Sequence, residues 1–438
     1  MDSLGPLSIP EPDALERATV RRVTRRLVPF LFALYIANYL DRVNVSFAAL
    51  QMNRDLGLSA TGYGAGAGIF FLGYCLLQVP SNLLLLRVGA RRWIGALMMG
   101  WGVIAVSMMF VRGARSFFAL RFLLGTVEAG FFPGTILYLS NWVPARARAR
   151  VVASFMTAVP AAGVIGGPVS GALLGLRGVG GLAGWQWLFL LEGLPSVVLG
   201  VVALRFLTDG PAEARWLAPD ARALLLDRLS SERGVVALDR STVWDALRAP
   251  VVWRLGLLYF FIVFGLYGQS LWLPQVIKGS SGMSDLTVGL LSVAPAIASM
   301  LGMVAVAAHS DRRGERYRHV ALPLLGSATG FALAAVVRDS PMLATASLTV
   351  AAVGFSGAFG PFWSIPAGLF SGPAQAGAIA AINAVGNLAG FVGPYAIGVI
   401  HDQTESFGGA LSIMAALMAA GALLAWSLGR SRAPRSAD

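Results

Sequence analysis

Long apolar runs alternate along the chain with short segments that hold most of the charged residues. The apolar runs are about 18 to 25 residues long, the length that a helix needs to cross roughly 30 Å of hydrocarbon. A backbone in lipid must satisfy its own hydrogen bonds, so each run is predicted to be an α-helix. About twelve membrane spans are predicted, at residues 27–50, 61–84, 90–111, 117–141, 151–175, 185–207, 252–276, 287–308, 320–337, 341–369, 375–400 and 406–429.

The composition agrees with residence in a membrane. Hydrophobic residues make up 56% of the chain and charged residues 13%, whereas a soluble domain carries roughly 25% charged residues. Mean hydropathy is +0.69. Nearly all of the 34 basic residues are arginine, which GC-rich bacterial genes favour. We therefore expect a multi-pass protein of a bacterial inner membrane, with the lipid bilayer as its surroundings.

The net charge of +12 indicates topology rather than a nucleic-acid partner. If the N-terminus is cytoplasmic, most basic residues fall in cytoplasmic segments. Lys and Arg prefer the cytoplasmic side of a membrane, so this asymmetry predicts that both termini are cytoplasmic. The opposite side receives Arg54, Arg112, Arg115, Arg177, Lys278 and Arg338.

One long polar stretch divides the chain into two groups of six spans. Residues 208–250 are rich in charges of both signs at helical spacing, which predicts a cytoplasmic linker with a solvated surface helix at about 218–233. The predicted units are an N-terminal segment, two six-helix bundles, the linker between them and a tail. Their ranges are 1–26, 27–207, 208–250, 251–429 and 430–438.

The two halves share sequence features at nearly one offset. Gly89 and Gly314, each in a basic loop, lie 225 residues apart, and Pro168 and Pro394, each after a glycine, lie 226 apart. Two independent motifs with one offset indicate an internal repeat. Parallel six-helix repeats around a cavity at the membrane midplane are an architecture of transporters.

Four charged residues lie well within the predicted spans. They are Asp41, Arg42, Arg121 and Glu128, and each costs about 2.5–3.5 kcal/mol at the centre of a span. Arg121 and Glu128 are two helical turns apart, about 10.5 Å along the axis, so they do not pair simply with each other. Their partners are expected on the first span, where Asn38, Asp41 and Arg42 share a helical face.

These charges suit the transport of an anion. A guanidinium binds a carboxylate through a bidentate fork, so Arg42 and Arg121 are candidates for the substrate site. Buried carboxylates change their proton affinity with their partners, so Asp41 and Glu128 are candidates for proton coupling. The alternative is an ion-pair network that locks the N-terminal bundle. Polar residues of other spans are second candidates for substrate contact or for hydrogen bonds between helices: Tyr74, Tyr267, Gln269, Ser364, Asn383 and Asn387.

Several stretches resemble the major facilitator superfamily and, within it, the anion:cation symporter family of tartrate, phthalate and hydroxyphenylacetate-type permeases. They lie at 38–50, 68–93, 121–144, 184–196 and 382–398. The resemblance implies alternating access, with Asp41 and Glu128 as proton sites and Arg42 and Arg121 near the substrate. It also implies that Tyr74, Ser364 and Asn387 contact the substrate. The residues that match the gating loops are Arg87, Gly89, Arg91, Asp311, Arg312 and Gly314, although Leu86 stands where the first loop usually has Asp.

The predicted function is uptake of a small organic anion, a carboxylate, by proton-coupled symport in a monomer. The apolar fifth span around 155–159 favours a small or partly aromatic acid over a sugar acid. No enzyme is expected because no nucleophile–base pair is found, and no cofactor because the proton gradient drives transport. No metal is expected, since His309, His319 and His401 are dispersed. Glu192 is interpreted as a structural residue near a helix end. The alternatives are an exporter or uniporter of the same fold, or a membrane ligand sensor.

Overall fold

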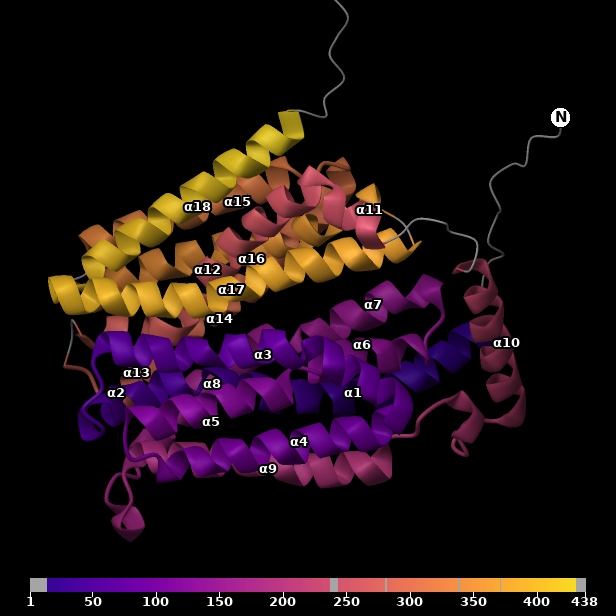
Figure 1. Ribbon diagram of the computed structural model, residues 1–438, viewed down its shortest axis with the longest axis horizontal. Helices are drawn as coiled ribbons and strands as arrows, with labels where there is room; N and C mark the ends of the chain where they lie inside the picture. The colour runs from indigo at the N-terminus through magenta and orange to yellow at the C-terminus, as the bar shows by residue number, and fades with distance from the viewer. Residues whose placement is uncertain (1–13, 237–242, 280–281, 338, 371, 431–438) are drawn as a thin grey trace, which may run out of the picture.

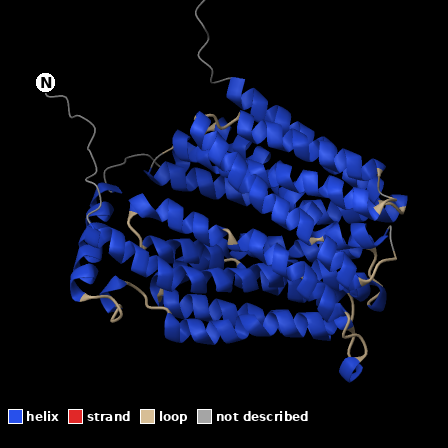
Figure 2. Cartoon of the chain, turned by 180° about the vertical axis from the view of Figure 1, so that it is seen from behind, coloured by secondary structure: helices blue, strands red, loops and turns tan. Residues whose placement is uncertain are grey.

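The computed structural model describes residues 14–236, 243–279, 282–337, 339–370 and 372–430. Helices make up nearly all of these residues, and the described part of the chain contains no strand (Figure 2). The predicted all-α class is confirmed. The N-terminal helices are α1 (Ala14–Val43), α2 (Val45–Asp55), α3 (Ala60–Val88), α4 (Ala90–Ser107), α5 (Ala114–Glu128), α6 (Phe131–Ser140), α7 (Ala145–Met156), α8 (Ala158–Leu174) and α9 (Gly184–Phe206). The later helices are α10 (Pro219–Val236), α11 (Val243–Arg248), α12 (Pro250–Gly279), α13 (Asp285–Leu291), α14 (Val293–Arg313), α15 (Arg318–Val336), α16 (Pro341–Leu369), α17 (Gly372–Thr404) and α18 (Phe407–Arg430).

Eleven helical stretches of the described residues are long and apolar enough to cross a membrane. The first predicted span, 27–50, is not among them. Its residues form α1 and α2, which are separated at Asn44, and they include the charged pair Asp41 and Arg42. The first span is therefore helical but broken next to its charges, which also lower its hydropathy.

The helices form two groups that lie one above the other (Figure 1). One group contains α1 to α9, and the other contains α12 to α18. Helix α10 stands across one end of the first group, and α2 and α13 lie at the opposite end. These ends of the molecule are called below the α10 end and the α2 end.

The repeated loop glycines have the same backbone property in both halves. Gly89 joins α3 to α4 with a φ of +91°, and Gly314 follows α14 with a φ of +64°. Positive φ is costly for residues with a Cβ, so both turns require glycine. The two loops thus share a glycine with positive φ, although its ψ is 148° at Gly89 and 12° at Gly314.

The two groups pack through glycines near the α2 end. A Cβ on Gly64 of α3 would lie 2.2 Å from the Pro394 carbonyl oxygen of α17, and one on Gly167 of α8 would lie 2.5 Å from the Gly289 carbonyl oxygen of α13. Small residues let helix backbones approach closely in membranes. The second and eleventh spans, and the fifth and eighth, therefore form the close contacts between the halves.

Hydrogen bonds reinforce the contact at the α2 end. The Asp402 carboxylate of α17 accepts the backbone N–H groups of Ala60 and Thr61 at 3.0 and 2.8 Å, at the start of α3. Gln51 of α2 donates to Asp285 of α13 at 2.8 Å. The two halves are joined here by polar contacts as well as by backbone packing. The charged residues Asp41 and Arg42 lie near the end of α1.

Candidate functional site

A buried ion pair between Arg42 of α1 and Glu128 of α5 lies at the centre of the site. Arg42 Nε donates to Glu128 Oε1 at 2.7 Å, and Nη2 approaches the same oxygen. The exposed fractions of the two residues are 7% and 0%. The prediction that the charges of the fourth span find partners on the first span is confirmed.

Two helix ends place this pair. Arg42 lies in the last turn of α1, and Glu128 is the last residue of α5. The free carbonyl groups of a helix C-terminus favour a nearby cation, which helps to hold the guanidinium at this position. Asn44 and Ala129 follow the pair at the two breaks, so the charged residues lie where their spans are interrupted.

Arg42 also links the two halves of the molecule. Its Nη1 donates to the hydroxyl oxygen of Tyr267 on α12 at 3.2 Å. The Tyr267 ring lies 4.3 Å from that of Phe71 on α3, measured between centroids. Tyr267 therefore completes the site from the C-terminal half. The sequence indicated it only as one of several polar residues within spans.

Aromatic rings surround the Arg42 guanidinium. Its central carbon lies 5.2 Å from the ring centroid of Tyr74 and 5.4 Å from that of Phe70. Tyr39 is at 6.0 Å. Aromatic faces attract cations. Tyr74, predicted to contact substrate, thus lies beside the arginine.

Arg121 is buried next to the backbone of Arg42, and 1% of its surface is exposed. Its guanidinium donates to the carbonyl oxygen of Ala67 on α3 at 3.1 Å and to that of Arg42 at 3.4 Å. In this conformation it joins the end of α1 to α3. Its Nε has no hydrogen-bond partner within the described structure.

Asp41 does not join the pair of Arg42 and Glu128. Its Oδ2 accepts the hydroxyl of Ser196 on α9 at 2.5 Å, and Asp41 is 1% exposed. Successive residues of a helix point about 100° apart. Arg42 therefore faces α5 and α12, whereas Asp41 faces α9.

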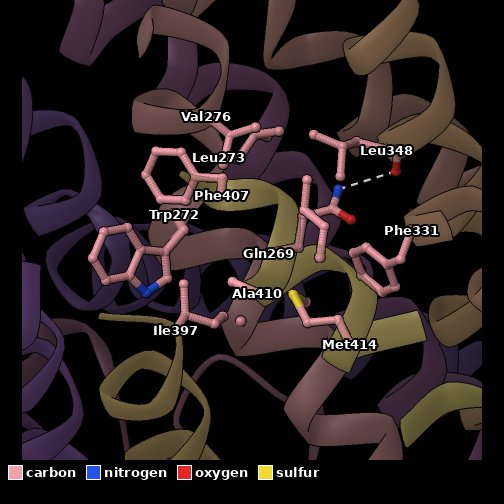
Figure 3. A pocket seen from close by; sticks show the side chains of 12 residues that line it. Gln269, Trp272, Leu273, Val276, Phe331, Leu348, Ile397, Phe407, Ala410 and Met414 are labelled. Carbon is pink, nitrogen blue, oxygen red and sulfur yellow. Dashed lines mark hydrogen bonds between the residues drawn. The ribbon is translucent and has the colours of Figure 1, made fainter. Parts of the chain in front are cut away.

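Gln269 lies among residues of the C-terminal half (Figure 3). It lines a small, mainly apolar cavity with Trp272, Phe331 and Met414, and its amide donates to the Leu348 carbonyl oxygen at 3.2 Å. The cavity volume is about 10 Å³, close to the minimum that holds one water. The structure thus separates Gln269 from the arginine site.

The other predicted contact residues of the C-terminal half are half-buried. Ser364 of α16 donates to the Gly360 carbonyl oxygen of its own helix at 3.1 Å. Asn383 and Asn387 lie one turn apart on α17. A Cβ on Gly390, three residues after Asn387, would lie 2.4 Å from the Phe71 ring. This part of α17 therefore lies close to the aromatic residues of the site.

The predicted gating loops lie away from the buried charges. In the first loop, the Asp209 carboxylate accepts the backbone N–H of Arg91 at 2.8 Å, so a distant residue supplies an acid where Leu86 replaces the usual Asp. Arg87 and Arg312 are exposed. In the second loop, Asp311 forms an ion pair with Arg316 at 2.5 Å.

Glu315, next in the second loop, is a helix-capping acid. Burial raises the pKa of its carboxyl, but hydrogen bonds from the Arg318 and His319 backbone N–H groups outweigh this effect and hold the pKa below its usual value. The loop is thus fixed by a charged cap at the start of α15.

The prediction that Glu192 lies near a helix end is wrong. It lies inside α9 rather than near a helix end, with 5% of its surface exposed. Its Oε1 accepts the hydroxyl of Ser170 on α8 at 2.7 Å. An acid nine residues into an apolar span was the signal that could have identified it.

No group of three or more His, Cys, Asp or Glu side chains suited to a metal ion is found among the residues that the structure describes. The ionisable groups of the site are instead arranged as acid–base and acid–hydroxyl pairs. Such pairs can bind an anion and exchange protons.

Comparison with known proteins gives consistent results over most of the chain. The family model of the Major Facilitator Superfamily matches residues 31–394. An Agrobacterium vitis protein named "Putative tartrate transporter" is 49% identical over 95% of this chain and 92% of its own length. The "Quinolone resistance transporter" of Acinetobacter baumannii is 38% identical over 94% of this chain and 95% of its own. A bacterial homolog of the human lysosomal transporter Spinster, solved in an inward-facing and occupied conformation, has a similar fold, with a TM-score of 0.76 and 16% identity over 96% of this chain and 98% of its own.

Proposed function

The chain belongs to the major facilitator superfamily, and from this premise we propose that it takes up a small carboxylate in symport with protons. Membership makes it a multi-pass membrane transporter. The proposal adds the chemistry of the substrate and the driving ion. It also places the protein in a bacterial inner membrane with both termini cytoplasmic, as a monomer without a cofactor.

The single observation that carries the proposal is the ion pair of Arg42 and Glu128. A substrate carboxylate would compete with Glu128 for the guanidinium, because both are anions that suit its fork. Glu128 is 0% exposed. Without its cation it would be an unpaired buried charge, which costs several kcal/mol. Binding of the anion therefore favours protonation of Glu128, and this exchange couples the anion to a proton.

The position of the pair supports alternating access. Arg42 belongs to the N-terminal half and Tyr267 to the C-terminal half, and they share a hydrogen bond. A substrate that takes Arg42 from Glu128 would also alter the contact with Tyr267. The same binding event would thus act on both halves, which must move relative to each other during transport.

The aromatic character of the site favours an acid that is partly apolar. Tyr74, Phe70 and Tyr39 surround Arg42, and Phe155 packs against Tyr35 with ring centroids 4.8 Å apart. The faces of these rings offer apolar contact, although Tyr74, Tyr39 and Tyr35 also carry hydroxyl groups. The tartrate name of one relative supports a carboxylate, whereas the quinolone resistance name of another supports the alternative of an exporter.

Uptake by purified protein in liposomes tests the proposed function. We expect labelled carboxylates, tartrate and aromatic acids among them, to accumulate when the lumen is more alkaline than the outside. Collapse of the pH gradient with a protonophore should abolish accumulation. Active protein that moves no acid with the gradient, or that depends on Na⁺ instead, would contradict the proposal.

Glu128→Gln is expected to separate exchange from accumulation. Glutamine keeps the size of the side chain but cannot gain and lose a proton, so substrate counterflow should continue while pH-driven accumulation falls at least tenfold. Counterflow and gradient-driven uptake are measured in the same liposomes. Unchanged accumulation in this variant would exclude Glu128 as a coupling site.

A further inference from the structure

An open cleft lined by arginines lies at the α10 end, away from the buried charges of the central site. Its volume is about 470 Å³. Helix α1 forms one wall, and the loop between α9 and α10 contributes a tryptophan to the other. This arginine cleft is lined by Ala18, Arg21, Arg22, Arg25, Arg26 and Trp216.

The packing of α1 directs its four cleft arginines to one side of the helix. Thr19, Val23 and Leu27 lie one turn apart along the opposite face, and each is at most 4% exposed. The arginines form two pairs, at 21–22 and 25–26, that are one turn apart, about 6 Å along the axis. The buried face therefore fixes the direction in which both pairs point.

Arg26 is held in place by aromatic rings. Its guanidinium carbon lies 4.9 Å from the ring centroid of Phe206 and 4.9 Å from that of Trp216. Trp216 in turn stacks on Trp142, with ring centroids 5.5 Å apart. A guanidinium that stacks on aromatic faces keeps the N–H donors of its edge for a ligand. One cation of the cleft is thus preorganised.

The cleft has an excess of positive charge. Residues 14–26 contain five arginines and one acid, Glu16, and Glu16 pairs with Arg228 of α10 at 3.2 Å. Arg21, Arg22 and Arg25 are exposed and form no hydrogen bond or ion pair within the part of the chain that the structure describes. The preference of arginine for the cytoplasmic side explains their number, but not a shared face and a common cleft. Guanidinium groups gathered in this way suit the oxygens of phosphate.

The position of the cleft favours a lipid as the source of the phosphate. Phe206, which contacts Arg26, is the last residue of the apolar span Gly184–Phe206. The end of a span lies at the level of the lipid headgroups. Val202 and Val198, one and two turns before Phe206 on the same face of α9, are 40% and 53% exposed. Apolar surface for acyl chains therefore lies directly beside the arginines.

We propose that the arginine cleft binds the phosphate groups of an anionic phospholipid, with its acyl chains along the exposed face of α9. Basic clusters next to a membrane span bind such headgroups. Two pairs of arginines suit a headgroup with two phosphates, as in cardiolipin. The bound lipid would join α1 to the loop that precedes α10. This binding does not depend on the proposed symport.

Native mass spectrometry of delipidated protein in detergent tests the site. Cardiolipin should bind the wild type more tightly than zwitterionic phosphatidylethanolamine. An arginine near an anionic lipid strengthens binding roughly fivefold. The triple variant Arg21→Gln/Arg22→Gln/Arg25→Gln should therefore bind cardiolipin on the order of 100-fold more weakly, with phosphatidylethanolamine unaffected. Equal binding of the two lipids by the wild type, or unchanged cardiolipin binding by the triple variant, would overturn the proposal.

Two further variants distinguish a built site from a general attraction of charge. Arg112→Gln/Arg115→Gln/Arg177→Gln is the matched control, because it removes three exposed arginines near the starts of α5 and α9 and should bind cardiolipin as the wild type does. Trp216→Ala changes no charge but removes a ring that holds Arg26, so it should weaken cardiolipin binding roughly fivefold. An equal loss in both triple variants, or full binding by Trp216→Ala, would show that the cleft is not the site.

Pyrophosphate distinguishes a lipid from a soluble phosphate compound. It carries two phosphates without acyl chains, and its affinity for the wild type is measured in the same way. We expect it to bind at least tenfold more weakly than cardiolipin, because it lacks the contact with the exposed face of α9. Binding as tight as that of cardiolipin would make a soluble phosphate compound the ligand and would overturn the lipid assignment.

Discussion

Replacement of Arg42 by glutamine is expected to lower anion uptake on the order of 100-fold or more, the largest loss among single substitutions at the site. Breaking a buried ion pair costs about 3–5 kcal/mol, and here the same arginine is the proposed anion ligand. Glu128 would remain buried without its cation, and the hydrogen bond to Tyr267 of α12 would be lost. Initial rates of uptake and of counterflow in liposomes measure the effect, and both are expected to fall.

The conservative variant distinguishes charge from geometry. Arg42→Lys keeps the positive charge but not the fork that reaches Glu128 and Tyr267 together, so it should recover only a small part of the activity. Arg177→Gln, at an exposed position between α8 and α9, is the matched control and should transport normally. Wild-type rates and apparent affinity in folded Arg42→Gln would rule out Arg42 as the anion ligand.

Gly167→Val is expected to hinder closure of the α2 end and so to slow transport by roughly 5- to 150-fold. A Cβ at this position would lie 2.5 Å from the Gly289 carbonyl oxygen, so α8 and α13 would have to separate. Overpacking typically costs about 1–3 kcal/mol, and a bias of that size between two states changes their ratio by about 5- to 150-fold.

Disulfide cross-linking across the α2 end measures this change directly. Asn53 of α2 donates to Gln275 of α12 at 3.2 Å, so cysteines at both positions should cross-link in a Cys75→Ser background. Gly167→Val should slow the cross-linking as well as transport. Gly326→Val is the control, because a Cβ on Gly326 meets nothing within 4 Å. Fast cross-linking and slow transport together in Gly167→Val would show that the packing argument is wrong.

Much of the fold could be predicted because the membrane restricts what a chain can do. Apolar length predicts helices, since unsatisfied backbone groups are too costly in hydrocarbon. The offset between Gly89 and Gly314 predicted the repeat, and both glycines have positive φ. The break at Asn44 was not foreseen, because no proline or glycine marks it in the sequence.

The sequence was sufficient to identify the four costly charges and to predict that those of the fourth span meet the first. Only the tertiary structure decided that Arg42 pairs with Glu128 while Asp41 turns to Ser196. The physical reason is that adjacent residues of a helix point about 100° apart. The chain order does not tell which neighbouring helix lies on each side. The packing of α1 against α5, α9 and α12 places Arg42 against Glu128 and Tyr267 and places Asp41 against Ser196.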